Sequence, residues 1–69
     1  MRTYAKRMTD RQVNTKFARL LKIAFDRCEN YNEVYAFVYR RFNDLYVHGH
    51  ISLNQFQQVD LDLQKELNM

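Results

Sequence analysis

Residues 9–12, with the sequence TDRQ, have a pattern that begins a helix, and the same pattern returns twice along the chain. In such a capping box the side chain of the first residue accepts a hydrogen bond from the amide of the fourth. The side chain of the fourth residue bonds back to the first amide. Residues 30–33 (NYNE) and 52–55 (SLNQ) repeat the pattern. Three such starts in 69 residues predict three short helices.

The apolar residues that follow each start recur at steps of three and four, which places them on one face of a helix. They predict helices over residues 10–27, 31–47 and 53–67. Gly49 falls between the second and third helices, where a left-handed glycine commonly ends a helix. Because both connections are short, neighbouring helices are expected to run antiparallel. The predicted core-facing residues are Val13, Phe17, Leu20, Leu21, Ala24, Cys28, Val34, Phe37, Val38, Phe42, Leu45, Phe56, Val59, Leu63 and Leu67.

We therefore predict an all-α fold, in which residues 1–69 form a single small three-helix domain and the first eight residues form a loose basic arm. The chain has no proline and one glycine, which is too few turn-forming residues for a β-rich fold of this size. No apolar run approaches the roughly 18 residues that span a bilayer, and no signal peptide is recognisable. The single cysteine forms no internal disulfide. These features predict a cytoplasmic protein that does not bind membranes.

The charge is divided unevenly along the chain. Residues 1–28 carry a net charge of +6, whereas residues 29–69 carry −3. A basic front of this kind can neutralise the phosphates of a nucleic acid without reading its bases. A base-reading third helix is not expected, because residues 53–67 are acidic. The nucleic-acid surface predicted in this way consists of Arg2, Lys6, Arg7, Arg11, Arg19 and Lys22.

More apolar and aromatic surface is present than three short helices can bury. Several of these side chains fall at the edges of the predicted apolar stripes or outside them. Tyrosine is enriched at protein interfaces, and a small domain has little core of its own, so a protein partner or a second copy of the chain is expected to cover them. The predicted protein interface consists of Tyr35, Tyr39, Tyr46, Ile23 and Leu61.

No group of residues predicts catalysis. Asp44, His48 and Ser52 are spaced by four, but Ser52 is better placed as a helix cap than as a nucleophile. His48 and His50 are too few to hold a metal ion. Cys28 lies at the apolar end of the first helix, where a lone thiol behaves as a small hydrophobic group. We therefore expect no enzyme activity, no catalytic or metal-binding residue, no cofactor and no small-molecule substrate.

One set of residues, read with gaps, resembles the Hha/YmoA family of small helical proteins. The residues concerned are Thr15, Lys16, Arg27, Cys28, Val34, Val38, Asp60, Leu63, Glu66, Leu67 and Met69. The resemblance spans residues 15–69 and implies a non-enzymatic cytosolic modulator that binds a nucleoid protein. The chain departs from the family pattern because it has an additional basic arm and no tryptophan-bearing tail, and it is not assigned to the family.

Together these features favour a regulatory or adaptor protein that acts by protein–protein contact and associates with itself, with a transcription or nucleoid complex as one candidate target. The alternative is a small nucleic-acid-binding regulator that uses the basic arm and the first helix. The two differ in the surface they use, which is tyrosine-rich in the first case and basic in the second.

Overall fold

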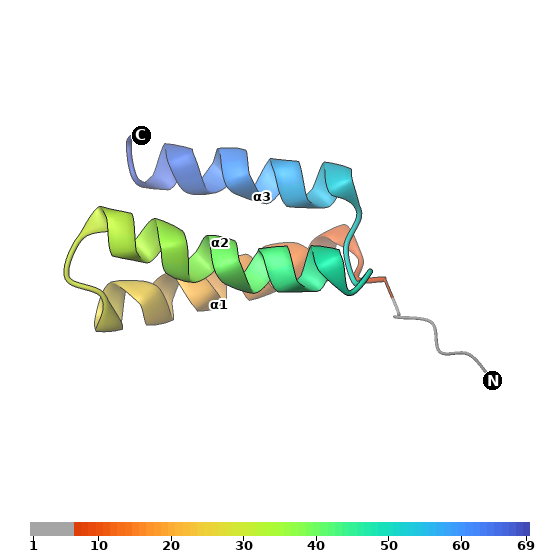
Figure 1. Cartoon of the computed structure of the whole chain (residues 1–69), viewed down its shortest axis with the longest axis horizontal. Coiled ribbons are helices and arrows are strands. Elements are labelled where there is room, and N and C mark those ends of the chain that lie inside the picture. Colours follow the sequence, from red (N-terminus) through yellow and green to blue (C-terminus); the bar gives the residue numbers. More distant parts are fainter. Residues whose placement is uncertain (1–6) are drawn as a thin grey trace.

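Three helices follow one another along the chain in the computed structural model, which describes residues 7–69 (Figure 1). They are α1 (Asp10–Arg27), α2 (Tyr31–Val47) and α3 (Leu53–Glu66), and neighbouring helices run antiparallel. The all-α prediction is confirmed: residues 7–69 contain no strand. The predicted bounds differ from these only at α3, because Leu67 is the residue that caps this helix. None of the helices in this part of the chain is long and apolar enough to cross a membrane.

Two of the three predicted capping boxes are complete. At the start of α1 the Thr9 amide donates to Gln12 Oε1 (2.9 Å) and the Gln12 amide donates to Thr9 Oγ1 (3.2 Å). At the start of α3 the same two bonds join Ser52 and Gln55, at 2.9 and 3.1 Å. Each box satisfies two amides that the first turn of a helix would otherwise leave without a partner.

The third predicted box, at the start of α2, is only half formed. Asn30 caps the helix as expected, because its Oδ1 accepts from the Glu33 amide at 2.9 Å. Glu33 does not return the bond to Asn30, however. Its carboxylate accepts instead from the amide of Glu29, at 3.0 Å. The acidic side chain reaches one residue further back, so the predicted reciprocal bond is wrong at this helix although the predicted start is right.

Gly49 ends α2 in the left-handed conformation predicted for it, with φ at 81°. Its amide donates to the carbonyl of Tyr46, and the His50 amide donates to the carbonyl of Leu45. These two bonds form a Schellman motif, which requires a positive φ at the residue after the cap. Asn68 forms the same arrangement after α3, with φ at 56°. Asparagine tolerates this conformation better than most residues with a side chain.

The core lies where the inner faces of the three helices meet. Val13, Leu20 and Ala24 are its buried residues on α1, and Phe42 on α2 is fully buried. The ring of Phe17 packs 6.4 Å from that of Phe42, so aromatic contact joins α1 to α2. All fifteen residues predicted to face the core either are buried or pack against it: Val13, Phe17, Leu20, Leu21, Ala24, Cys28, Val34, Phe37, Val38, Phe42, Leu45, Phe56, Val59, Leu63 and Leu67.

Met8 fixes the chain to the bundle just before α1. Its amide donates to the carbonyl of His50 at 2.7 Å, and its carbonyl accepts from Gln55 Nε2 at 3.0 Å. The second amide hydrogen of Gln55 binds Asp10 Oδ1 at 2.9 Å. The loose arm predicted over the first eight residues therefore does not extend to Met8. The rest of that prediction, on residues 1–6, lies outside the described residues.

Candidate functional site

Three tyrosines of α2 and one phenylalanine of α3 pack together where these two helices meet. Tyr35 stacks on Tyr39 with ring centroids 5.5 Å apart. Phe56 lies 5.2 Å from Tyr39 and 5.3 Å from Tyr46, so one ring of α3 fits between two rings of α2. The tyrosines are four and seven residues apart, which places them in one row along α2. We call these four residues the aromatic band.

Hydrogen bonds fix one end of the aromatic band. The hydroxyl of Tyr35 donates to Asp60 Oδ1 at 2.6 Å, and the other carboxylate oxygen accepts from Gln64 Nε2 at 3.1 Å. The hydrogen bond to Asp60 is the main cause that raises the pKa of Tyr35 to about 12; burial and the negative charge of Asp60 add to it. Tyr35 therefore keeps its proton at neutral pH and joins α2 to α3.

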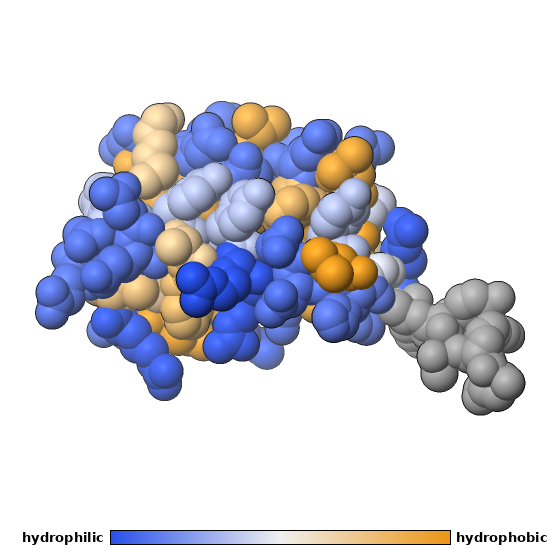
Figure 2. Space-filling view, in the orientation of Figure 1, coloured by the Kyte–Doolittle hydropathy of each residue, from blue (hydrophilic) through white to orange (hydrophobic). Residues whose placement is uncertain are grey.

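Two tyrosines of the aromatic band are open to solvent. Tyr39 is 36% exposed and Tyr46 is 37% exposed, and Leu53, at 49%, extends the row of Phe56 towards the start of α3. In Figure 2 pale, weakly hydrophilic residues form a row across the face towards the viewer, where α2 and α3 lie side by side. Among residues 7–69, the one formal charge bonded to the band is the carboxylate of Asp60, which already accepts two hydrogen bonds. The face is thus aromatic and poor in charge.

The other two residues of the predicted protein interface lie elsewhere. Leu61 is 56% exposed on α3, and it follows Phe56 by five residues, which turns it about 140° around the helix. Ile23 is half-buried on α1 and belongs to neither helix of the band. The structure therefore brings Tyr35, Tyr39 and Tyr46 together and separates them from Ile23 and Leu61. That any of the five residues binds a partner stays a prediction.

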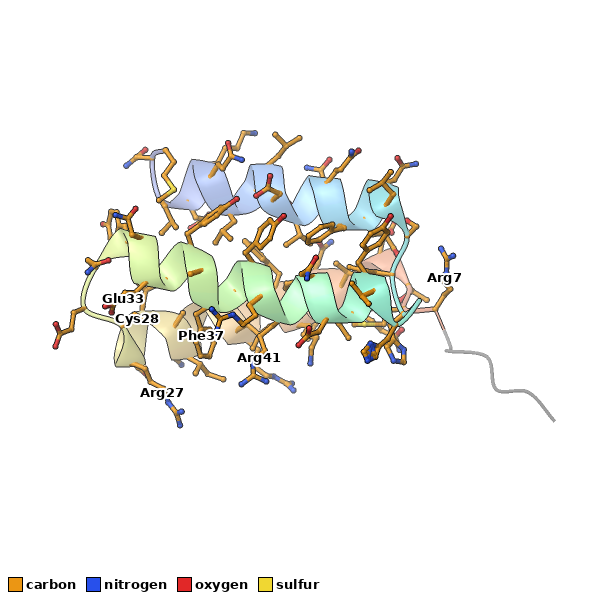
Figure 3. All side chains as sticks on the ribbon, viewed as in Figure 1. Arg7, Arg27, Cys28, Glu33, Phe37 and Arg41 are labelled. Atoms are coloured by element: carbon orange, nitrogen blue, oxygen red, sulfur yellow. The ribbon has the colours of Figure 1, made fainter. Side chains whose placement is uncertain are left out.

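A second surface, on α1, is basic. The side chains that precede and follow the start of this helix surround an open depression of about 510 Å³. Arg7, Arg11 and Arg19, all predicted for nucleic-acid binding, line it, and so does Lys16. Lys22 is exposed one turn beyond Arg19. Figure 3 shows Arg7 at the end of the bundle where the chain enters α1. Of the six predicted residues, Arg2 and Lys6 lie outside the described part of the chain.

Two of the residues considered for catalysis or redox chemistry, Ser52 and Cys28, have structural roles. The Ser52 hydroxyl accepts from the Gln55 amide in the capping box, as expected. Cys28 is half-buried and packs against the core. Within residues 7–69 no three histidine, cysteine or acidic side chains are grouped closely enough to hold a metal ion. A second depression, of about 300 Å³ between α1 and α3, is lined by polar side chains with Val13 and Val59, and it contains no histidine or cysteine.

The contacts that the aromatic residues form between α2 and α3 are not predictable from the sequence. Phe56 is predicted as a core residue, but it also holds the tyrosine row of α2. The Tyr35–Asp60 bond joins residues 25 positions apart, and its only sequence signal is that both residues sit at the edge of an apolar stripe. The Arg41 guanidinium lies 5.4 Å from the ring of Phe37, a cation–π contact that the spacing of four residues on α2 allows (Figure 3).

Comparisons of the chain with protein-family models, with curated proteins and with solved structures give no match. The aromatic band and the basic surface of α1 are therefore the observations from which a function can be inferred. They differ in chemistry. One is aromatic and nearly uncharged, and the other consists of hydrogen-bond donors that carry positive charge.

Proposed function

We propose that this protein is a non-enzymatic regulatory or adaptor protein that binds a protein partner through the aromatic band. The observation that supports this most strongly is the composition of the exposed surface at the band. Tyr39 and Tyr46 of the band and the neighbouring Leu53 present apolar area, and the carboxylate of Asp60 beside the band is already hydrogen-bonded. Protein interfaces are depleted in charge at their centre and enriched in tyrosine, and a few aromatic side chains there contribute most of the binding energy.

The rigidity of the band favours the same function. Association loses the conformational freedom of the side chains that become ordered at the interface, at about 0.5–1.5 kcal/mol for each flexible one. Tyr39 and Tyr46 are already held by contact with Phe56, so little further freedom is lost when a partner covers them. Within residues 7–69 their hydroxyls have no hydrogen-bond partner, and both are available to one.

The small size of the chain is a second reason to expect a partner. A domain of this length buries only about 60% of the surface that its unfolded chain exposes, so additional burial against another molecule stabilises it considerably. A second copy of the chain is one such partner, and a component of a transcription or nucleoid complex is another. We expect the partner in the cytoplasm, where the single Cys28 stays reduced.

Site-specific photocrosslinking tests this proposal. A benzoylphenylalanine placed at position 39 in cells is expected to give one crosslinked adduct of defined mass. An adduct of twice the chain's mass identifies a second copy, and any other mass identifies a different partner. The variant Leu53→Glu is expected to abolish the adduct, because it introduces a carboxylate beside the band. Glutamate at the first position of α3 is compatible with the helix dipole, so the fold should be kept.

Leu61→Glu is the matched control. It makes the same chemical change on the same helix at a residue of similar exposure, about 140° away from the band. The adduct should survive this substitution. The absence of any adduct from position 39, or an adduct that Leu53→Glu leaves intact, would contradict the proposed use of the band. Loss of the adduct with Leu61→Glu alone would place the contact on the side of α3 that carries Leu61, away from Phe56.

A further inference from the structure

The outward side of α1 carries a concentration of positive charge that the proposed function does not use. Arg11, Arg19 and Lys22 lie within about 80° of one another around the helix, on the side away from its buried residues. Arg7 precedes the helix and Lys16 flanks the group, so that four of these five residues line the same depression. We call Arg7, Arg11, Lys16, Arg19 and Lys22 the basic face. From Arg11 to Lys22 it extends about 16 Å along the axis.

The described part of the chain does not neutralise these charges. Within residues 7–69 none of the five side chains forms an ion pair with a carboxylate. Asp26 is the only acidic residue on the same helix beyond its first turn. Four like charges along about 16 Å of α1, with Arg7 just before the helix, repel one another, and an anion that repeats at a similar spacing would remove this repulsion. We propose that the basic face binds the phosphate backbone of duplex DNA, without preference for its sequence.

The chemistry of the face favours this ligand over other anionic partners. Its five charged side chains are hydrogen-bond donors, and Met8, Gln12 and Thr15 line the depression with them. Three of the five are arginines, each of which can bind two phosphate oxygens at once. Within residues 7–69 the face has the half-buried Met8 at one end, and the exposed ring of Phe25 follows Lys22 by three residues at the other, where it packs against Tyr31. A single exposed ring at one end gives less apolar area than an acidic protein or a membrane surface would need as an anchor. No aromatic ring lines the depression between Arg7 and Arg19, so the bases of a single strand have no ring to stack on there.

The basic face and the aromatic band can be occupied together. Arg11, Arg19 and Lys22 of the basic face point away from the buried residues of α1, whereas the band is built by α2 and α3 alone. A duplex along α1 therefore leaves Tyr39 and Tyr46 open. The DNA-binding proposal does not depend on the proposed protein partner, and either can fail without the other.

The expected salt dependence of DNA binding follows from the release of counterions from the phosphates. Each phosphate contact contributes about 0.9 to the slope of log K against log salt concentration, so five contacts give a slope of about −4 to −5. Affinity should fall about 300- to 1,000-fold when monovalent salt is raised from about 50 to about 200 mM. An uncharged binding surface, or a site that reads bases and contacts few phosphates, would show a much smaller dependence of affinity on salt concentration.

Fluorescence anisotropy with a labelled duplex of about 20 base pairs tests the proposal on the whole chain, with circular dichroism to verify that each variant is folded. Arg11→Glu with Arg19→Glu should weaken binding at least about 100-fold at about 50 mM salt, because two of the five contacts are reversed in charge. Arg11→Gln with Arg19→Gln is the milder variant, and it should reduce the salt slope by about 1.8. Arg40→Glu with Lys65→Glu changes the net charge equally on the exposed surfaces of α2 and α3, and it should weaken binding less than about fivefold.

Three results would overturn the proposal. The first is no binding at low salt, or binding that does not depend on salt. The second is an equal loss of affinity for the duplex in the Arg11/Arg19 and Arg40/Lys65 variants. This would show that binding depends on the net charge of the protein and not on the basic face. The third is tighter binding to a single strand, or to vesicles with anionic headgroups, than to the duplex. The photocrosslinking at position 39 is unaffected by all three.

Discussion

The hydroxyl of Tyr35 can be removed by Tyr35→Phe without changing the shape of the ring that stacks on Tyr39. The bond lost is the 2.6 Å contact with Asp60, which joins α2 to α3. Hydrogen bonds to a charged group contribute about 1.5–3 kcal/mol when they are buried. Water competes for this one because Tyr35 is only half-buried, so we expect a loss of about 1–1.5 kcal/mol in the free energy of unfolding at pH 7.

The same bond predicts how stability changes in alkali. The bond raises the pKa of Tyr35 to about 12 in the folded chain, against 10.0 for a free tyrosine. A group whose pKa is higher in the folded state stabilises the fold while it is protonated. The contribution is therefore complete below about pH 10 and is lost as the pH rises towards 12. The difference between the wild type and Tyr35→Phe should shrink as the pH rises above 10 and be close to zero by about pH 12.

Urea denaturation followed by circular dichroism measures both effects. Asp60→Asn and the double variant complete a cycle that isolates the coupling between Tyr35 and Asp60, expected at about 1 kcal/mol at pH 7. Tyr31→Phe is the control, because Tyr31 is exposed and forms no hydrogen bond through its hydroxyl within residues 7–69. The reasoning is refuted if Tyr35→Phe is as stable as the wild type at pH 7, or if the difference between them persists unchanged to pH 12.

Two further substitutions test the fold. Phe42→Ala removes a fully buried ring and its contact with Phe17, which should cost about 3–5 kcal/mol, a large part of the stability of so small a domain. Thermal unfolding by circular dichroism measures this, and a loss below about 1 kcal/mol would mean that the ring is not packed as described. Gly49→Ala places a β-carbon at a φ of 81° and should cost about 1–2 kcal/mol, whereas Gly49→Asn should cost less. Equal stability of the wild type and the Gly49→Ala variant in urea would argue against the left-handed end of α2.

The fold can be predicted from the sequence because its decisive interactions are local. Thr9 with Gln12 and Ser52 with Gln55 are three residues apart, and the Gly49 turn needs only the residues around it. The half-formed box at Asn30 shows the limit of this reasoning. Glutamate and glutamine look equivalent in the pattern, but the Glu33 carboxylate accepts from the amide of Glu29, which is also within its reach.

The candidate surfaces are only partly predictable, because they depend on how one helix is aligned with another. The row of Tyr35, Tyr39 and Tyr46 is visible in the sequence as an edge of α2. Nothing in the sequence states that Phe56 lies between two of these rings or that Asp60 accepts from the first. Periodicity gives the face of each helix but not its shift along the neighbouring helix. For the same reason the sequence predicts neither how close Phe56 lies to the tyrosines nor how far the exposed residues of α3 lie from them.

Because the fold places the basic and the acidic parts of the sequence on different helices, the surface charge of the protein is also uneven. The basic first part of the chain includes α1, and the acidic second part forms α2 and α3, with Asp62 and Glu66 on α3. Packed helices lie about 8–10 Å apart, and at physiological salt the Debye length is about 8 Å. A polyanion against α1 would therefore be attracted by the basic face and feel the acids of α3 only weakly. The net charge of +3 consequently understates the local attraction, and a duplex held by α1 would leave the aromatic band pointing towards a protein partner.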